Sequence, residues 1–148
     1  IHTGSPIFLV MALHLEIVTP EEKIFSGDVE NIYFPGTDGE MGVLEMHVAL
    51  VTGLVPGELR YLQDGKTEEL AVGEGFVEVT GHNVVVLTDL AVGDAQIDED
   101  AVEAAMKRAE ESLHKIDQTT DLEQAAILQA TIAKSMAQLK LKRKRRSV

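Results

Sequence analysis

The chain has 148 residues, among them 12 glycines, 4 prolines and no cysteine. Without cysteine there is no disulfide framework, no thiolate metal site and no thiol nucleophile. No apolar run approaches the roughly 20 residues that a membrane-spanning helix needs, so we expect no direct membrane span. The formal net charge of −12 is divided unevenly along the chain. A chain of this length fits one domain, or one small domain with an appendage.

Turn residues and charge divide the sequence near residue 95. Every glycine and proline lies within residues 1–93, and the remainder is alanine-rich, charged and periodic. Residues 1–133 contain all 25 acidic and 6 basic side chains, a net charge of −19, whereas residues 134–148 contain 7 basic side chains and no acidic one. We therefore expect a turn-rich domain over residues 11–94 and a helical unit with a basic tail over residues 95–148. Opposite charge on body and tail favours an interaction arm over an autonomous enzyme.

The first ten residues, 1–10, lack an initiating methionine. We interpret them as a vector-derived leader and Met11 as the native start, which favours a bacterial protein. A cleaved signal peptide is the alternative. It fits less well, because no lysine or arginine precedes the apolar stretch and that stretch is short.

Short alternations of apolar and polar residues predict strands in the turn-rich domain. The first is Leu13–Val18. A second strand is expected to contain Val29, Ile32 and Phe34 and to end at Pro35. Later runs at 59–62, 69–72, 75–80 and 84–88 have a spacing typical of an all-β sandwich or barrel.

Three tight turns separate these runs. Asp38-Gly39 and Asp64-Gly65 are strong turn signals, because glycine accepts the positive φ that such turns need. Gly81-His82-Asn83 is the third. The sequence therefore predicts hairpins joined by short turns, with a mainly aliphatic core, since there is no tryptophan.

The last part of the chain has the periodicity of two helices. Asp98 can cap the first, whose apolar side chains recur at i, i+3 and i+4. A short polar connection at 117–120 predicts that the second helix folds back antiparallel to the first. The expected stripe of the first helix is Val102, Ala105, Met106, Ala109, Leu113 and Ile116, and that of the second is Leu122, Ala125, Ala126, Ile132, Ala133, Met136 and Leu139.

Alanine makes up much of both stripes. Apolar burial stabilises by roughly 25 cal/mol per Å², and alanine offers little area. We therefore expect the helical hairpin to dock weakly on the β domain and to detach as a unit.

The sequence contains no convincing catalytic or metal site. The five histidines, which include His14 and His47, form no helical i, i+4 pair, so surface or structural roles are favoured over metal ligation. Residues 36–42 are rich in glycine but match neither a phosphate loop nor a dinucleotide fingerprint. No serine lies in a nucleophile elbow. We expect no catalytic residue, no metal and no cofactor.

The basic tail, residues 140–146, allows several partners. Phosphates, anionic lipid or an acidic protein segment would all suit its charge. Nucleic acid is disfavoured, because the acidic body would repel the backbone and no aromatic residues are interleaved for stacking. A solvated helix end whose cations complement the helix dipole is an equally weighted alternative to the acidic-protein reading.

Several segments together resemble one family. Residues 13–18, Ile24-Phe25-Ser26-Gly27, Gly39-Glu40-Met41-Gly42 and residues 73–79 are similar to motifs of the epsilon subunit of rotary F-type ATP synthases. The resemblance covers residues 12 to about 140. It implies an N-terminal β-sandwich of about ten strands followed by two antiparallel helices.

The resemblance also implies a function. In the family, the non-catalytic sandwich lies at the foot of the central stalk, binds the gamma subunit and rests on the ring of c subunits. It couples ring rotation to the catalytic head of alpha and beta subunits, as a peripheral protein on the cytoplasmic face of the bacterial inner membrane. The helical hairpin folds down on the sandwich or extends along gamma, where its cations meet an acidic loop of the beta subunit and ATP hydrolysis is inhibited.

Individual residues match positions of the family pattern. Glu40 corresponds to the carboxylate that faces the c-ring loops. His47 corresponds to the histidine of a Pro-Gly-His-Ala-Pro loop, although residues 45–49 lack its prolines and glycine. The cations that correspond to the inhibitory helix are Lys134, Lys140, Lys142, Arg143, Lys144 and Arg145.

Some bacterial members bind ATP through an Ile/Leu-Asp-x-x-Arg-Ala motif. Here Asp98 is retained, but Ala101 replaces the arginine and Val102 the alanine. Arg108 matches a second arginine, whereas Gln138 stands where the second helix would offer another. Loss of bidentate arginines removes most of the charge that complements phosphate, so we expect weak or no ATP binding.

Two other functions are alternatives. A stand-alone β-sandwich binding module could use the basic tail on an anionic membrane or protein, and tight association with a gamma-type subunit would argue against it. An enzyme is the third and least favoured interpretation, because the sequence shows no convergent acid–base or metal constellation.

Overall fold

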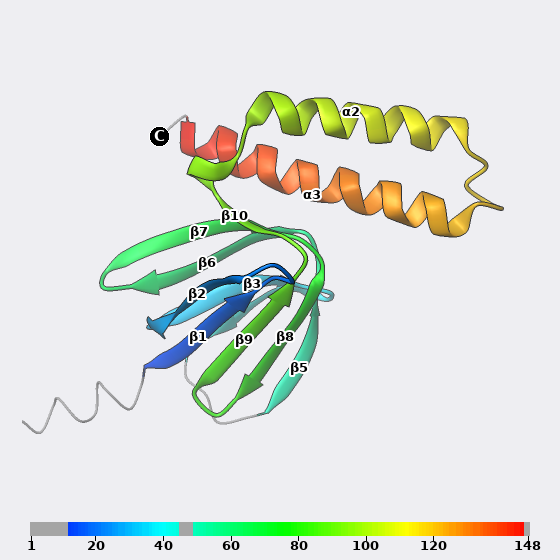
Figure 1. Cartoon of the computed structure of the whole chain (residues 1–148). Helices are drawn as coiled ribbons and strands as arrows, with labels where there is room; N and C mark the ends of the chain where they lie inside the picture. Colours follow the sequence, from blue (N-terminus) through cyan, green and yellow to red (C-terminus); the bar gives the residue numbers. More distant parts are fainter. Residues whose placement is uncertain (1–11, 45–48, 147–148) are drawn as a thin grey trace, which may run out of the picture.

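The computed structural model describes residues 12–44 and 49–146 and confirms the predicted fold class of ten strands followed by two antiparallel helices (Figure 1). The bounds are β1 Leu13–Val18, β2 Lys23–Val29, β3 Asn31–Gly36, β4 Gly39–Val43, β5 Leu50–Leu54, β6 Gly57–Gln63, β7 Lys66–Val72, β8 Gly75–Thr80, β9 Asn83–Thr88, β10 Ala91–Gly93, the 3-10 helix η1 Asp94–Gln96, α2 Glu99–Lys115 and α3 Leu122–Arg146.

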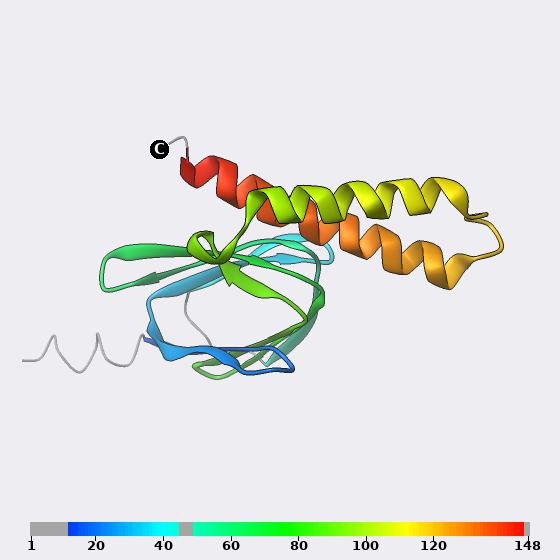
Figure 2. The same cartoon turned by 45° about the horizontal axis from the view of Figure 1, so that its top comes forward.

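The strands form one continuous sheet that folds over itself. Its order is β10-β7-β6-β3-β5-β8-β9-β1-β2, with β4 paired to β3. Figure 2 shows the resulting barrel-like sandwich beneath the helices. The fold closes where β2 approaches β6: Gln63 Nε2 donates to the Asp28 carbonyl at 3.0 Å, and the rings of Phe25 and Tyr61 lie 4.5 Å apart.

Alternating side chains fill the interior of this sheet, as period-2 patterning requires. The core is aliphatic apart from Phe34 and, at its edge, Tyr61. Because these strands bury their apolar side chains among themselves, the sandwich has a core that does not depend on the helices. The fully buried side chains in it include Leu13, Leu15, Ile17, Ile32, Phe34, Leu59, Val72, Val77, Val79, Val84 and Val86.

The prediction of one strand through Val29, Ile32 and Phe34 was wrong. Val29 ends β2, which pairs with β1, whereas Ile32 and Phe34 belong to β3, which pairs with β4, β5 and β6. Val29 and Ile32 are both buried. An odd spacing of three would place them on opposite faces of a single strand, so the chain must change direction between them, and it does so at Glu30.

The predicted tight turns are confirmed. Asp64 and Gly65 both have positive φ, of 51° and 79°, and they join β6 to β7 between the paired Gln63 and Lys66. Two positive φ values are the geometry whose twist matches that of a hairpin. Gly81, with φ 61°, serves the β8–β9 hairpin, and the β3–β4 hairpin turns immediately before Gly39.

Helix α2 follows the sequence expectation closely. The Asp98 carboxylate accepts a hydrogen bond from the Ala101 amide at 3.1 Å and caps the helix. The predicted stripe from Val102 to Ile116 is the face turned away from solvent, with Ala109 buried and the other members of the stripe partly buried. This face packs against α3, which lies between α2 and the sheet (Figures 1 and 2).

The predicted stripe of α3 was wrong in part. Leu122 and Met136 are exposed, at 68% and 58%, whereas Ser135 and Leu141 are buried. The reason is that α3 contacts α2 and the β6–β7 surface on different sides, so a single stripe cannot describe it. Leu141 packs with Ala71 of β7 and with Ile97 just before α2.

Candidate functional site

Cations along the second half of α3, from Lys134 onward, lie against acidic groups of the same chain. Lys134 Nζ is 3.2 Å from Asp89 Oδ2. Lys142 Nζ donates to the Asp94 carbonyl at 3.1 Å and lies 3.7 Å from its carboxylate. These pairs tie α3 to the segments on either side of β10.

A second group of ion pairs joins the end of α3 to the start of α2. Arg143 Nε lies 2.8 Å from Glu99 Oε2, and its Nη2 contacts Glu103. Arg146 also pairs with Glu99. Hydrogen bonding from Arg143 holds the pKa of Glu99 below its usual value. The antiparallel arrangement thus brings the acidic N-terminus of one helix to the basic C-terminus of the other, and each set of charges suits its own helix dipole.

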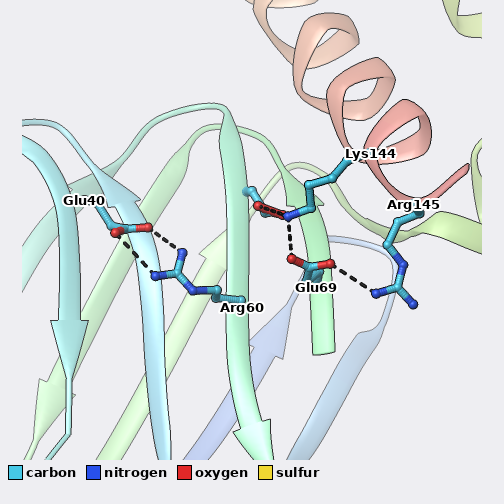
Figure 3. Close-up of polar contacts among 6 residues, drawn as sticks. Glu40, Arg60, Glu69, Lys144 and Arg145 are labelled. Carbon is cyan, nitrogen blue, oxygen red and sulfur yellow. Dashed lines mark hydrogen bonds and ion pairs between the residues drawn. The ribbon is translucent and has the colours of Figure 1, made fainter. Parts of the chain in front are cut away.

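A third group clamps the tail to the sandwich (Figure 3). Lys144 Nζ lies 2.6 Å from Glu58 Oε2 on β6 and 2.5 Å from Glu69 Oε2 on β7, and Arg145 Nη1 lies 3.2 Å from Glu69 Oε1. The Glu69 side chain is only 13% exposed. Burial raises the pKa of Glu69, but hydrogen bonds involving Lys144, Glu58 and Arg145 outweigh it and leave the pKa below its usual value. Hydrogen bonds to Glu58 and Glu69 raise the pKa of Lys144.

Glu40 is engaged within the chain as well. It lies on β4 just after the turn, and its Oε2 is 2.7 Å from Arg60 Nη1 on β6. Arg60 stacks 4.5 Å above the Tyr33 ring, and the hydrogen bond to Glu40 raises the pKa of Arg60. Figure 3 shows this pair beside the Lys144 clamp on the same side of the sheet.

The degenerate ATP motif does not converge on one site. Asp98 caps α2, and Arg108 is exposed on that helix. Neither lines the cavity of about 350 Å³ between α2, α3 and the end of β9. Its one basic lining residue is Lys134, which pairs with Asp89. Gln138 also lines this cavity, where it offers no charge to a phosphate.

Three further predicted residues remain to be placed. His47 lies outside the described residues. Lys140 and Arg108 are exposed, and within residues 12–44 and 49–146 neither forms an ion pair.

An exposed apolar surface on the sandwich was missed from sequence. Val51, Phe76 and Leu87, on β5, β8 and β9, are 64%, 60% and 48% exposed. Phe76 lies opposite Leu87 in the β8–β9 register. A shallow cavity of about 360 Å³, lined by Val18, Pro20, Gly75 and Leu87 among others, adjoins this surface. The signal in the sequence was the unbroken apolar run Val84-Val85-Val86-Leu87, in which both faces of one strand are apolar.

His14 lies in a polar cluster on the open face of β1 and β2. Its Nδ1 is 3.0 Å from Asp28 Oδ1, and its Nε2 is 3.4 Å from Ser26 Oγ. These contacts resemble those of a serine–histidine–aspartate triad. However, the His14 and Asp28 side chains are 41% and 75% exposed, and a second carboxylate, that of Glu16, lies 3.7 Å from the same Nε2. We interpret His14 as a surface histidine.

Membrane-spanning helices and metal clusters are both absent from the described part of the chain. None of its helices has both the length and the apolar character needed to cross a membrane. Residues 12–44 and 49–146 also contain no cluster of three or more histidine, aspartate or glutamate side chains suited to a metal ion.

Comparison with known proteins identifies the family. The family profile described as "ATP synthase, Delta/Epsilon chain, beta-sandwich domain" matches residues 12–94. The chain belongs to this family. It is 41% identical over 133 residues to the ATP synthase epsilon chain of Nitrosococcus oceani, which covers 89% of this chain and 93% of the relative. It is 43% identical over 113 residues to that of Desulforamulus reducens, which covers 76% and 86% respectively.

Solved structures agree with this membership. A chain in the mitochondrial ATP synthase of Euglena gracilis, in an assembly of OSCP, F1 and c-ring, matches with a TM-score of 0.71 and 25% identity, over 88% of this chain and 80% of that one. A chain in the central stalk and c-ring assembly of Tetrahymena thermophila matches with a TM-score of 0.53 and 12% identity, which speaks for the fold alone.

Proposed function

We propose that this chain is a non-catalytic rotor subunit that couples rotation of the c-ring to the catalytic head of an ATP synthase. The observation that carries the proposal is the 41% identity to an ATP synthase epsilon chain over 89% of this chain. That match spans both the sandwich and the helical hairpin. The corresponding location is peripheral, on the cytoplasmic face of the bacterial inner membrane.

The gamma subunit would bind the exposed apolar surface of β5, β8 and β9. Phe76, Val51 and Leu87 are exposed on three strands of the sandwich, apart from the exposed apolar side chains of α3 such as Leu122 and Met136. Exposed apolar patches of this kind commonly mark protein interfaces, and aromatic side chains often supply the largest share of the binding energy.

Glu40 would contact the c-ring. Its carboxylate is held by Arg60 in the isolated chain, so a cationic loop of the ring would have to replace or share that partner. His47, which lies outside the described residues, remains a second proposed contact on the ring and gamma side.

The helical hairpin would inhibit ATP hydrolysis by presenting its cations to an acidic loop of the beta subunit. The residues proposed for this contact are Lys134, Lys140, Lys142, Arg143, Lys144 and Arg145. Most of them are paired with acidic groups of the same chain. This supports an arm that is inactive while docked and that must leave the sandwich to act.

The pairing does not by itself separate this function from the alternative of a stand-alone module with a tail for anionic membranes. Cations matched to internal carboxylates would have to give up those contacts before they met either lipid or an acidic protein loop. The gamma-binding experiment below separates the two functions.

We expect ATP to bind weakly or not at all. The cavity between the helices has Lys134 as its one basic lining residue, and Asp89 holds it. Isothermal titration calorimetry of the full chain with Mg-ATP measures this directly. A dissociation constant in the micromolar range would contradict the expectation.

The test of the proposed function is ATP hydrolysis by a catalytic head that contains gamma but lacks this subunit. The full chain and a version ending at Asp94 are titrated in parallel, and binding to gamma is measured for both. We expect both to bind gamma and only the full chain to lower the rate.

Each other outcome has a distinct meaning. If both versions bind and neither inhibits, the chain is a coupler and the inhibitory part of the proposal fails. If neither binds gamma, the rotor assignment fails and the stand-alone module replaces it.

A further inference from the structure

We propose that Glu58 and Glu69 form an internal receptor for Lys144 and Arg145, which competes with any acidic partner for the end of α3. We call these four residues the latch. The inference rests on the proposed function only for its consequence, because the latch itself is a property of the isolated chain.

The latch joins residues that are far apart in sequence. Lys144 and Glu58 are separated by 86 positions. Lys144 Nζ bridges the two carboxylates, at 2.6 Å from Glu58 and 2.5 Å from Glu69, and Arg145 adds a contact of 3.2 Å to Glu69. Without the tail, the carboxylates of Glu58 and Glu69 would lie next to each other. The adjacent cation would then be Arg60, which lies opposite Glu69 in the strand register. The sandwich surface is therefore complementary to a cationic segment before any partner arrives.

An apolar contact fixes the register of the latch. Leu141 is buried against Ala71 and Ile97, three residues before Lys144. Residues three apart on a helix lie on neighbouring parts of one face. Docking of Leu141 therefore brings Lys144 to the carboxylates of β6 and β7.

Two sets of ion pairs along α3 respond to different motions, while the pair of Lys142 with Asp94 lies at η1, between the sandwich and α2. The pairs of Lys134, Lys144 and Arg145 join α3 to the sandwich and would break when the hairpin leaves as a unit. The pairs of Arg143 and Arg146 with Glu99 join α3 to α2 and would survive that motion. Detachment as a unit thus releases Lys144 and Arg145 to a partner, while Arg143 and Arg146 stay matched to α2. Arg143 would therefore have to exchange Glu99 and Glu103 for the acidic loop to take part in the proposed beta-subunit contact.

The experiment uses the full chain alone. Because the chain contains no cysteine, pairs of cysteines can carry spin labels without background. Labels at Thr67 and Gln129, both exposed, report the distance from sandwich to α3. Labels at Ser112 and Gln129 report the distance from α2 to α3. Pulsed electron resonance gives the population of each distance.

The first label pair gives an open-to-docked ratio, the population at the longer distance divided by that at the shorter one. We expect the double variant Glu58→Gln with Glu69→Gln to raise this ratio roughly tenfold, which is the change that a few surface ion pairs can produce. The second label pair should keep its distance. Salt at 0.5 M should open the unmodified chain in the same way, since exposed charges are screened, and should change the double variant less.

The matched control is Glu68→Gln with Glu78→Gln. It removes the same charge from exposed strand positions that make no ion pair with the described α3 cations, and it should leave the ratio unchanged. Exchange of the charges, Glu58→Lys and Glu69→Lys with Lys144→Glu and Arg145→Glu, should restore docking.

The latch is overturned if the double variant and the unmodified chain have equal ratios, if the control opens equally, or if the unmodified chain is already open. The salt series tests the latch even where a variant fails to fold.

Competition between the latch and the acidic partner is measured in the hydrolysis assay, where the double variant should inhibit at up to tenfold lower concentration than the unmodified chain. Equal concentrations would overturn the competition. If the chain does not bind gamma, the proposed rotor function is wrong, but the spin-label result still tests the latch.

Discussion

At the scale of single residues, two kinds of side-chain environment set the behaviour of the chain. Glu69 is a mostly buried carboxylate surrounded by charges: Lys144 and Arg145 from α3, and Glu58 and Arg60 from β6. Gly75 is a glycine that the packing requires. A Cβ at that position would lie 1.8 Å from the Leu87 carbonyl oxygen of the neighbouring strand.

The lowered pKa of Glu69 gives docking of the helices a pH dependence. A carboxyl group whose pKa is lower when docked stabilises the docked state above its ordinary pKa of about 4.3, and that contribution is lost as pH falls below it. The raised pKa of Lys144 keeps the contact intact up to about pH 10.5. Spin-label distances should therefore be constant from pH 6 to 9 and show opening as the pH falls below the ordinary glutamate pKa of about 4.3. The Glu69→Gln variant should be partly open at neutral pH and should respond less to acid, and an equal response would contradict the assignment.

Gly75→Ala should destabilise the sandwich. The added methyl group meets backbone rather than a flexible side chain, so the β8–β9 pairing must shift, at a cost of about 2–4 kcal/mol. Urea unfolding measures the change. Gly93→Ala is the control, because its Cβ would find a leucine side chain at an ordinary contact distance of 3.6 Å. Equal stability of the two variants would contradict the expected clash.

At the scale of elements, α3 determines how the helical hairpin relates to the sandwich. Its central part packs on α2, its last turns pack on β6 and β7, and the loop between the helices extends past the edge of the sandwich (Figures 1 and 2). The apolar part of the docking contact is small and centres on Leu141. Weak docking, expected from the alanine content, stays a prediction, and the ion pairs add to a limited apolar contact.

Leu141→Ala tests that contact. Truncation of a buried leucine typically costs about 2–5 kcal/mol, with the lower end where neighbours can relax. Because Leu141 joins the hairpin to the sandwich, we expect faster amide exchange along the end of α3 while exchange in the strands is unchanged. Met136→Ala, at an exposed position of the same helix, should change neither. Equal loss of protection in helices and strands would show that the two parts unfold together.

At the scale of the whole molecule, the sandwich separates two surfaces. The apolar surface of β5, β8 and β9 lies on strands other than those that hold the tail, since the latch is on β6 and β7. The chain could therefore keep one partner while its helices move. This arrangement suits a subunit that stays attached to a rotor while its arm changes position.

Phe76→Ala should weaken binding to gamma by roughly ten- to hundredfold, the range of an aromatic side chain at the centre of an interface. Its side chain is mostly exposed in the isolated chain, so stability should change little. Surface plasmon resonance with immobilised gamma measures the affinity. Ile127→Ala, an exposed apolar position on α3, is the control. Unchanged affinity of the Phe76 variant would place gamma on another surface.

Local sequence patterns predicted β1 and β6 to β9, the tight turns, the capped first helix and the division of charge, but they merged β2 with β3 and did not predict β4, β5 and β10. These features depend on neighbours within a few positions: alternation in strands, glycine at positive φ in turns, Asp98 at the start of α2. The spacing of three between Val29 and Ile32 also indicated a break between β2 and β3, because two buried residues of one strand are separated by an even number. Apolar character alone suggested one strand.

Tertiary structure alone decided which charges meet. Arg60 with Glu40 and Lys144 with Glu58 and Glu69 join separate elements, and a cationic tail has no local preference among many carboxylates. The two sides of α3 were likewise decided by packing, because a helix between two layers needs more than one buried face. Local periodicity indicates the elements, whereas the partners of surface charges depend on how the sheet folds over and on where α3 packs against it.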